Sequence, residues 1–219
     1  MNCRTEGAVC GIDGNTYTSE CAAHARQVSE DYDGPCRVVG LIGDKPRPQC
    51  SEDVVKCPPL TRSGCLGVTP PGACCPVCGG SLRLLYSQKQ VDRALYALRG
   101  NAVSALTLEA VLRALERQVQ VAECAVRGYR TVEMDLFVLV QAIGRDTPSD
   151  LQLEACVREA EKLANLVQVA SPRVLSELSL SALMTATIVH VPLRSTAFLV
   201  LPAWWLLFIL LVSTKLVCS

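Results

Sequence analysis

The stretch VCGIDGNTYTSEC, residues 9–21, decides how the first part of the chain folds. Asp13-Gly14-Asn15 is a tight-turn signal, and Thr16-Tyr17 behind it suits a short strand. Ser19 can then begin a helix over residues 20–27, because a serine hydroxyl at the N-cap accepts a hydrogen bond from an amide of the first turn. The pattern predicts a small α+β module with one cysteine before the turn, Cys10, and another at the start of the helix, Cys21.

The cysteines divide the chain into a rich and a poor part. Ten of the thirteen lie in residues 1–80. This density predicts a disulfide scaffold, which persists only in an oxidising compartment and argues against a cytosolic enzyme. The 21 Lys and Arg residues balance the 21 Asp and Glu residues, so no basic footprint for a nucleic acid exists. With two histidines in the chain, we expect no metal site, no cofactor and no enzymatic activity.

The stretch closely resembles the Kazal family of serine-protease inhibitors, and the resemblance covers residues 3–36. It places Cys3, Cys10, Cys21 and Cys36 in the second, third, fourth and sixth positions of the family pattern, which implies the bridges Cys3–Cys21 and Cys10–Cys36. The first cysteine is missing and His24 stands where the fifth belongs, so one bridge is lost and no cysteine is orphaned. We expect His24 to face solvent.

The resemblance also implies an inhibitory loop formed by Arg4, Thr5 and Glu6, which Gly7 follows, with Thr5 in the specificity position. Kazal inhibitors present a rigid loop that fits a serine protease as a substrate does, and a preorganised loop avoids the ordering cost on binding. The loop is one residue shorter than usual, and the missing bridge would brace its N-terminal side. The alternative is a Kazal-like fold that serves as a structural or protein-binding module.

Residues 37–80 form a second cysteine-rich segment. Residues 37–49 are typical of a linker or a leading strand, and Pro-rich loops follow that bridges must hold together. Six cysteines allow fifteen connectivities, and we expect them to pair among themselves: Cys50, Cys57, Cys65, Cys74, Cys75 and Cys78. The end of the segment, residues 71–78, resembles the close of a von Willebrand factor type C repeat. Structural disulfides are favoured there over a zinc ribbon or a redox motif.

From residue 81 the composition shifts to Leu, Val and Ala. Apolar spacing predicts a helix behind Thr107, and a capping box of Ser149 and Gln152 predicts the start of a second one. Strands are expected at 81–87, 119–126, 136–143 and about 186–191. The resulting order β-α-β-β-α-β suggests a ferredoxin-like α+β sandwich over residues 81–192.

Two pairs of residues in this region need an interpretation. Cys124 is expected on a strand and Cys156 on the core-facing side of a helix, so the two most simply form a bridge, with buried free thiols as the alternative. Glu133 and Asp135 lie close together in sequence. A solvated turn explains them better than acid–base chemistry.

Residues 193–219 are expected to be an attachment signal for a glycosylphosphatidylinositol (GPI) anchor. Ala197–Val212 has no charge over 16 residues, enough for a hydrophobic helix of about 24 Å against a hydrocarbon core of about 30 Å. Small residues and a polar spacer precede it, as in such signals. Attachment is predicted at Thr185, with Ser179 and Ser181 as alternatives, although cleavage near Thr185 would remove the last predicted strand. A single transmembrane anchor is the alternative for the tail.

Together, the modules resemble a family of GPI-anchored cell-surface glycoproteins that contain Kazal motifs. The resemblance implies a lipoprotein on the extracellular face of the plasma membrane whose partners are extracellular proteases, matrix metalloproteinases among them. The alternative partner is a cell-surface receptor, with the chain as a non-inhibitory co-receptor or scaffold stalk in Wnt signalling. Because the chain opens on Met1-Asn2-Cys3 without a signal peptide, we expect either the C-terminal piece of a longer precursor or the product of a truncated gene model.

Overall fold

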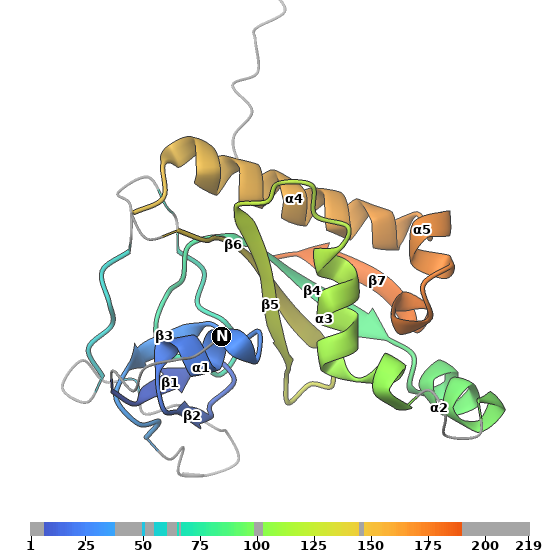
Figure 1. Ribbon diagram of the computed structural model, residues 1–219, viewed down its shortest axis with the longest axis horizontal. Helices are drawn as coiled ribbons and strands as arrows, with labels where there is room; N and C mark the ends of the chain where they lie inside the picture. The colour runs from blue at the N-terminus through green and yellow to red at the C-terminus, as the bar shows by residue number, and fades with distance from the viewer. Residues whose placement is uncertain are drawn as a thin grey trace, which may run out of the picture.

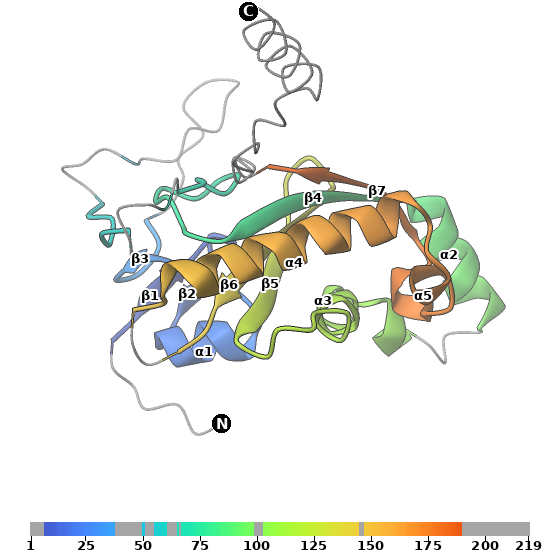
Figure 2. The same ribbon diagram turned by 90° about the horizontal axis from the view of Figure 1, so that it is seen from above.

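The protein is a disulfide-rich α+β structure built on two antiparallel sheets (Figures 1 and 2). The computed structural model describes residues 7–37, 50, 55–60, 65, 67–98, 103–144 and 147–189. Within these ranges, no helix is both long enough and apolar enough to cross a bilayer. The hydrophobic helix predicted within residues 193–219 lies outside them.

The smaller sheet belongs to the Kazal-like module. Its strands are β1 (Val9–Gly11), β2 (Thr16–Tyr17) and β3 (Glu30–Asp33), in the order β2-β1-β3, and α1 (Glu20–Ala25) lies between β2 and β3. The turn predicted at Asp13-Gly14-Asn15 forms, with Gly14 at a φ of +78°, a value that glycine adopts without strain. The predicted helix start is also confirmed, because the Ser19 hydroxyl accepts a hydrogen bond from Ala22 N at 3.2 Å.

The larger sheet has the order β5-β6-β4-β7, with every neighbouring pair antiparallel. Its strands are β4 (Gly80–Tyr86), β5 (Cys124–Arg130), β6 (Leu136–Ala142) and β7 (Leu183–Ile188). With α3 (Leu108–Glu116) and α4 (Asp150–Gln168), the chain order of the main elements is β-α-β-β-α-β, as the sequence predicts. The capping box of Ser149 and Gln152 opens α4.

Four further elements complete the described chain: α2 (Gln88–Ala97), the 3-10 turns η1 (Val103–Leu106) and η2 (Leu178–Leu180), and α5 (Pro172–Leu175). No helix is predicted at α2 from the sequence. A strand is predicted at residues 119–126, whereas β5 begins at Cys124. Val119 and Val121 are apolar because they pack on the core from the loop after α3, and they pair with no strand.

The larger sheet is covered on both faces. On one face, α4 packs on β4, β6 and β7 while α3 packs on β5, and the main core forms between them around Leu82, Val126 and Val138. On the other face, Phe137 and Leu139 of β6 lie in a second cluster that the Kazal-like module enters. Side chains alternate between the faces of a strand, so β6 carries apolar residues at every position from Leu136 to Val140.

Candidate functional site

The turn of the Kazal-like module is organised by one carboxylate. Asp13 accepts hydrogen bonds from Asn15 N at 3.1 Å, from Asn15 Nδ2 at 2.8 Å and from the Tyr17 hydroxyl at 2.8 Å. Burial, followed by the hydrogen bond to Asp13, raises the pKa of the Tyr17 phenol. The hydroxyl therefore stays protonated and continues to donate to Asp13.

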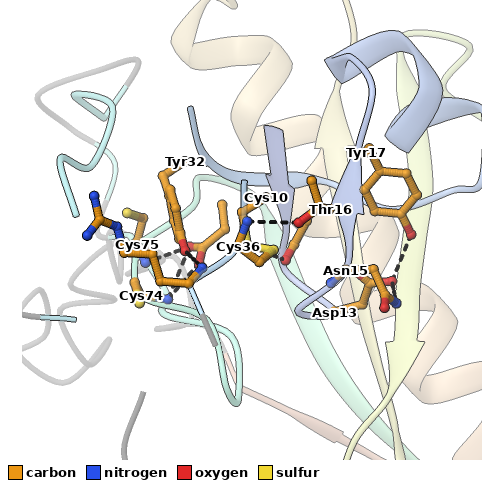
Figure 3. The surroundings of a disulfide bond; sticks show 12 residues. Cys10, Asp13, Asn15, Thr16, Tyr17, Tyr32, Cys36, Cys74 and Cys75 are labelled. Carbon is orange, nitrogen blue, oxygen red and sulfur yellow. Dashed lines mark hydrogen bonds between the residues drawn. A yellow bond between two sulfur atoms is a disulfide. The ribbon is translucent and has the colours of Figure 1, made fainter. Parts of the chain in front are cut away.

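Figure 3 shows the disulfide that closes this module, Cys10–Cys36. It is the pair that the Kazal resemblance implies. Next to it, Cys36 N donates to the Thr16 hydroxyl at 2.9 Å, which ties the end of the module to β2. Cys21 is also disulfide-bonded. Its expected partner, Cys3, lies outside the described residues, so this pairing stays a prediction.

The predicted inhibitory residues Arg4, Thr5 and Glu6 lie outside the described ranges as well. The chain that follows them is exposed at Gly7 and Ala8 and buried from Val9 onward. Gly34 N donates a hydrogen bond to Ala8 O at 2.8 Å. Two residues further on, Cys10 of β1 is held by its disulfide bond to Cys36. The C-terminal base of the predicted loop is therefore fixed at two points.

His24, which stands in place of the fifth Kazal cysteine, does not face solvent as predicted. Its side chain is 29 % exposed, and its Nε2 lies 3.5 Å from Glu20 Oε1. Burial, and next the charge of Arg127 on β5, lower the pKa of His24 to about 4. The residue occupies the side of α1 that turns toward the larger sheet, where a neutral imidazole fits and a second cation does not.

Apolar contacts dock the Kazal-like module on the larger sheet. Ile12 and Val28 of the module are buried in one cluster with Tyr129, Phe137 and Leu139 of β5 and β6. Gly128 N, on the free edge of β5, donates to Gln27 O at 2.9 Å. This hydrogen bond covers part of a sheet edge that would otherwise expose an unpaired backbone group.

Gln141 at the end of β6 is a polar hub that contacts three parts of the structure. Its Oε1 accepts a hydrogen bond from the Ser29 hydroxyl of the Kazal-like module and, at 3.1 Å, from Arg127 Nη1 of β5. Its Nε2 donates to Cys78 O at 3.3 Å. Burial lowers the pKa of Arg127 while Glu20 and Glu116 oppose that shift.

A buried carboxylate joins the Kazal-like module to the second cysteine-rich segment. Asp31 is 3 % exposed and accepts hydrogen bonds from Cys74 N at 2.9 Å and from Cys75 N at 2.7 Å. Burial raises its pKa, and these two hydrogen bonds act against the shift. The Tyr129 hydroxyl, from β5, donates to Pro71 O of the same segment.

The six cysteines of residues 50–78 pair among themselves as Cys50–Cys74, Cys57–Cys75 and Cys65–Cys78. This is one of the fifteen connectivities that the sequence left open. An isolated antiparallel bridge between Val68 and Val77 brings the closing residues together. Ala73, Val68 and Val77 contact the outer cluster of the sheet, so this segment fills the space next to the Kazal-like module.

The remaining predicted residues lie in the α+β region. Cys124 of β5 forms a disulfide with Cys156 of α4, on the helix-covered face. The turn expected at Glu133 and Asp135 is solvated at residues 132–134, but the prediction is wrong for Asp135 itself, which is 2 % exposed. It accepts a hydrogen bond from Arg83 Nε at 2.7 Å and another from the Thr131 hydroxyl, while Glu133 forms an exposed ion pair with the same arginine.

The three residues predicted for GPI attachment all lie within the folded region. Thr185 is in β7, opposite Leu85 of β4, and Ser179 is 8 % exposed in η2. Ser181 directly follows η2 and donates to Leu178 O at 2.7 Å. Attachment at any of them would remove all or part of β7, and the choice among them stays a prediction.

The docking residues are not among the site residues predicted from the sequence: Ile12, Val28, Phe137, Leu139 and Gln141. One signal for them was present: residues 136–140 are apolar without alternation, which indicates a strand buried on both faces. The predicted sandwich has helices on one face only, so a second cover was required. The sequence contains no obvious amphipathic segment to cover that second face, and nothing in it indicates that the Kazal-like module does so.

Within the described ranges, no group of three metal-binding side chains comes together. No protein-family model and no solved structure matches the chain.

Relatives nevertheless exist. The Danio rerio protein named reversion-inducing cysteine-rich protein with Kazal motifs (RECK) is 35 % identical over 195 residues, 89 % of this chain and 20 % of that protein. The Gallus gallus protein of the same name is 37 % identical over 227 residues, 86 % of this chain and 23 % of that protein. The Homo sapiens protein of the same name is 36 % identical over 223 residues, 84 % of this chain and 22 % of that protein. The chain thus spans about a fifth of the length of these relatives, and it is a segment related to the reversion-inducing cysteine-rich protein with Kazal motifs.

Proposed function

We propose that the chain is part of an extracellular, membrane-anchored regulator of proteases, in which residues 3–36 present a serine-protease-binding loop. The relationship to RECK supports a protease regulator and not an enzyme. The density of disulfides fits an extracellular or cell-surface protein. Restraint of matrix metalloproteinases belongs to this proposal through the same relationship, without named residues.

The observation that carries the proposal is the way in which the base of the loop is held. Ala8 is hydrogen-bonded to Gly34 and Cys10 is bridged to Cys36, while Gly7 and Ala8 stay exposed. Behind them, Ile12 and Val28 are anchored in the core on the larger sheet. Docking thus supplies rigidity that the missing Kazal bridge would otherwise provide, and rigidity lowers the ordering cost of binding.

Inhibition assays on the full chain test the loop. Thr5→Lys places a long cation in the specificity position, which suits a protease with an acidic pocket such as trypsin, so we expect it to create or strengthen trypsin inhibition. Thr18→Lys, an exposed position of the same module, adds the same charge and is expected to have no effect. If Thr5→Lys stays folded and gains no inhibition, residues 4–6 are not an inhibitory loop.

A second function, a non-inhibitory co-receptor or scaffold stalk in Wnt signalling, draws support from the same docking. The module uses one of its faces for contacts within the chain, as a structural module would. This function predicts binding to a cell-surface receptor with no change in the turnover of serine proteases or metalloproteinases. Inhibition of either class by the wild-type chain would argue against it.

The proposal keeps the four predicted segments 1–36, 37–80, 81–192 and 193–219, with the last as a GPI-attachment signal. Cells that display the full protein should release it when treated with a phosphatidylinositol-specific phospholipase. Retention after treatment would favour a transmembrane helix instead.

A further inference from the structure

An apolar recess of about 250 Å³ opens at the end of the larger sheet, on the helix-covered side. It lies where β4 and β5 end and where β6 and β7 begin, beside α2 (Figure 1). Aliphatic side chains dominate its wall: Val91, Leu108, Val111, Leu136 and Leu183. These side chains come from four separate elements, α2, α3, β6 and β7, so the recess is part of the tertiary fold.

The helix at its side is incompletely covered. α2 has no buried residue, although Val91, Ala94 and Leu95 on one side of it are partly buried. Two neighbours of the recess on the core side, Val111 and Leu136, are 8 % and 6 % exposed. The lining residues Val91, Leu108 and Leu183 are only partly buried and leave apolar surface open to the recess. An alkyl chain would remove this surface from water at a gain of about 0.8 kcal/mol per methylene group.

Arg130, the last residue of β5, lines the same recess and is exposed. Within the described ranges its guanidinium contacts the Met134 sulfur and forms no ion pair. Other surface arginines here do pair: Arg113 with Glu109 and Arg117 with Glu177. An unpaired guanidinium beside an apolar recess complements a ligand that has an anionic head and an apolar tail.

We propose that this recess binds a medium-chain carboxylate, with the carboxylate on Arg130 and the alkyl chain among Val91, Leu108 and Val111. If one methylene group occupies about as much volume as one water molecule, ~30 Å³, the recess of about 250 Å³ holds a single chain of about eight carbons. That volume is too small to enclose both chains of a two-chain lipid. The inference is independent of the proposed protease regulation, which involves the opposite face of the sheet.

Titration of the full chain with octanoate and with 1-octanol, followed by NMR of leucine and valine methyl groups, tests the proposal. Wild type should show saturable octanoate binding at about 1 mM, from the small number of ligand atoms. Arg130→Gln should weaken octanoate about tenfold and 1-octanol by no more than about twofold. Arg113→Gln removes the same charge from an exposed site on α3 and should change neither affinity.

Val91→Trp, at a position on α2 that is not fully buried, should fill the recess and weaken both ligands by more than about tenfold. All variants keep the complete chain, so any binding of octanoate or 1-octanol to other apolar segments is the same in each of them and cancels in the comparison. Three results would overturn the proposal: no saturable binding up to about 10 mM, equal effects of Arg130→Gln and Arg113→Gln on octanoate, or unchanged binding in a folded Val91→Trp variant.

Discussion

Docking of the Kazal-like module on the larger sheet predicts an energetic coupling between two residues that are far apart in sequence. Ile12 of the module and Leu139 of β6 are buried in the same cluster, at 1 % and 0 % exposed. Replacement of either by alanine removes buried methyl groups and leaves a cavity, which costs about 2–5 kcal/mol of unfolding free energy. Once one side of the interface is lost, the second replacement removes contacts that are already weakened.

We therefore expect the double variant Ile12→Ala/Leu139→Ala to be less destabilised than the sum of the single variants, by about 1 kcal/mol within the usual range of 0.5–3. The measurement is urea-induced unfolding of the four proteins with their disulfides intact. A matched control uses Leu82→Ala in place of Leu139→Ala. Leu82 is also 0 % exposed, but it lies on the helix-covered face of the sheet.

For the control pair we expect additivity within about 0.5 kcal/mol, because the two side chains share no cluster. Coupling in the docking pair but not in the control pair supports the interface. If Ile12→Ala and Leu139→Ala add as the control pair does, the Kazal-like module does not stabilise this face of the sheet. The base of its loop would then be held only by the hydrogen bond at Ala8 and the Cys10–Cys36 bridge, without added rigidity from docking.

Three further predictions concern single interactions. Because His24 has a pKa near 4 in the folded protein and about 6.5 when unfolded, the unfolded state binds the extra proton between these values. The unfolding free energy should then fall as pH drops from 6.5 to 4, by at most about 3 kcal/mol. His24→Gln removes this titration, so the unfolding free energy of the variant should depend less on pH over the same range. Replacement of both Cys124 and Cys156 by alanine removes a disulfide between residues 32 apart in sequence. The unfolding free energy measured with denaturant should fall by about 3–4 kcal/mol, and a fall below about 1 kcal/mol would contradict a stabilising role for this disulfide. Arg83→Gln should destabilise by about 1–3 kcal/mol, because it leaves the buried Asp135 carboxylate without its cation, and Asp135→Asn added to it should recover part of the loss, whereas a further loss would show that the pair is not coupled.

Local chemistry explains what could be predicted from the sequence. The turn at Asp13-Gly14-Asn15 and the helix starts at Ser19, Thr107 and Ser149 all depend on side chains within three residues of the backbone groups that they bind. Short-range hydrogen bonds of this kind are readable as spacing. The strand and helix order of the larger sheet followed from the periodicity of its apolar residues.

The helix α2 shows where that periodicity was available but unused. Val91, Ala94, Leu95 and Leu98 have helical spacing, and the Ser87 hydroxyl accepts a hydrogen bond from Gln90 N at 3.3 Å as an N-cap. The docking contacts are a different case. Ser29 donates a hydrogen bond to Gln141 across 112 residues of chain, and no local sequence pattern encodes a contact between residues so far apart.

The position of β7 restricts where the proposed lipid anchor could be attached. Ala186 is 0 % exposed and lies opposite Leu84 in the sheet, and its carbonyl accepts a hydrogen bond from Gln168 Nε2 of α4 at 2.7 Å. A chain that ends at Thr185 loses this residue, the pairing with β4 beyond it and the contact with α4. A strand edge and part of the main core would then be exposed to water, which costs several kcal/mol of a total stability that is about 5–15 kcal/mol.

Expression of chains that end at Thr185 and at Val189 tests this: the shorter chain should be poorly folded or retained in the cell, and the longer one should be folded. Secretion of both as folded proteins would mean that β7 is dispensable and that Thr185 suits lipid attachment after all.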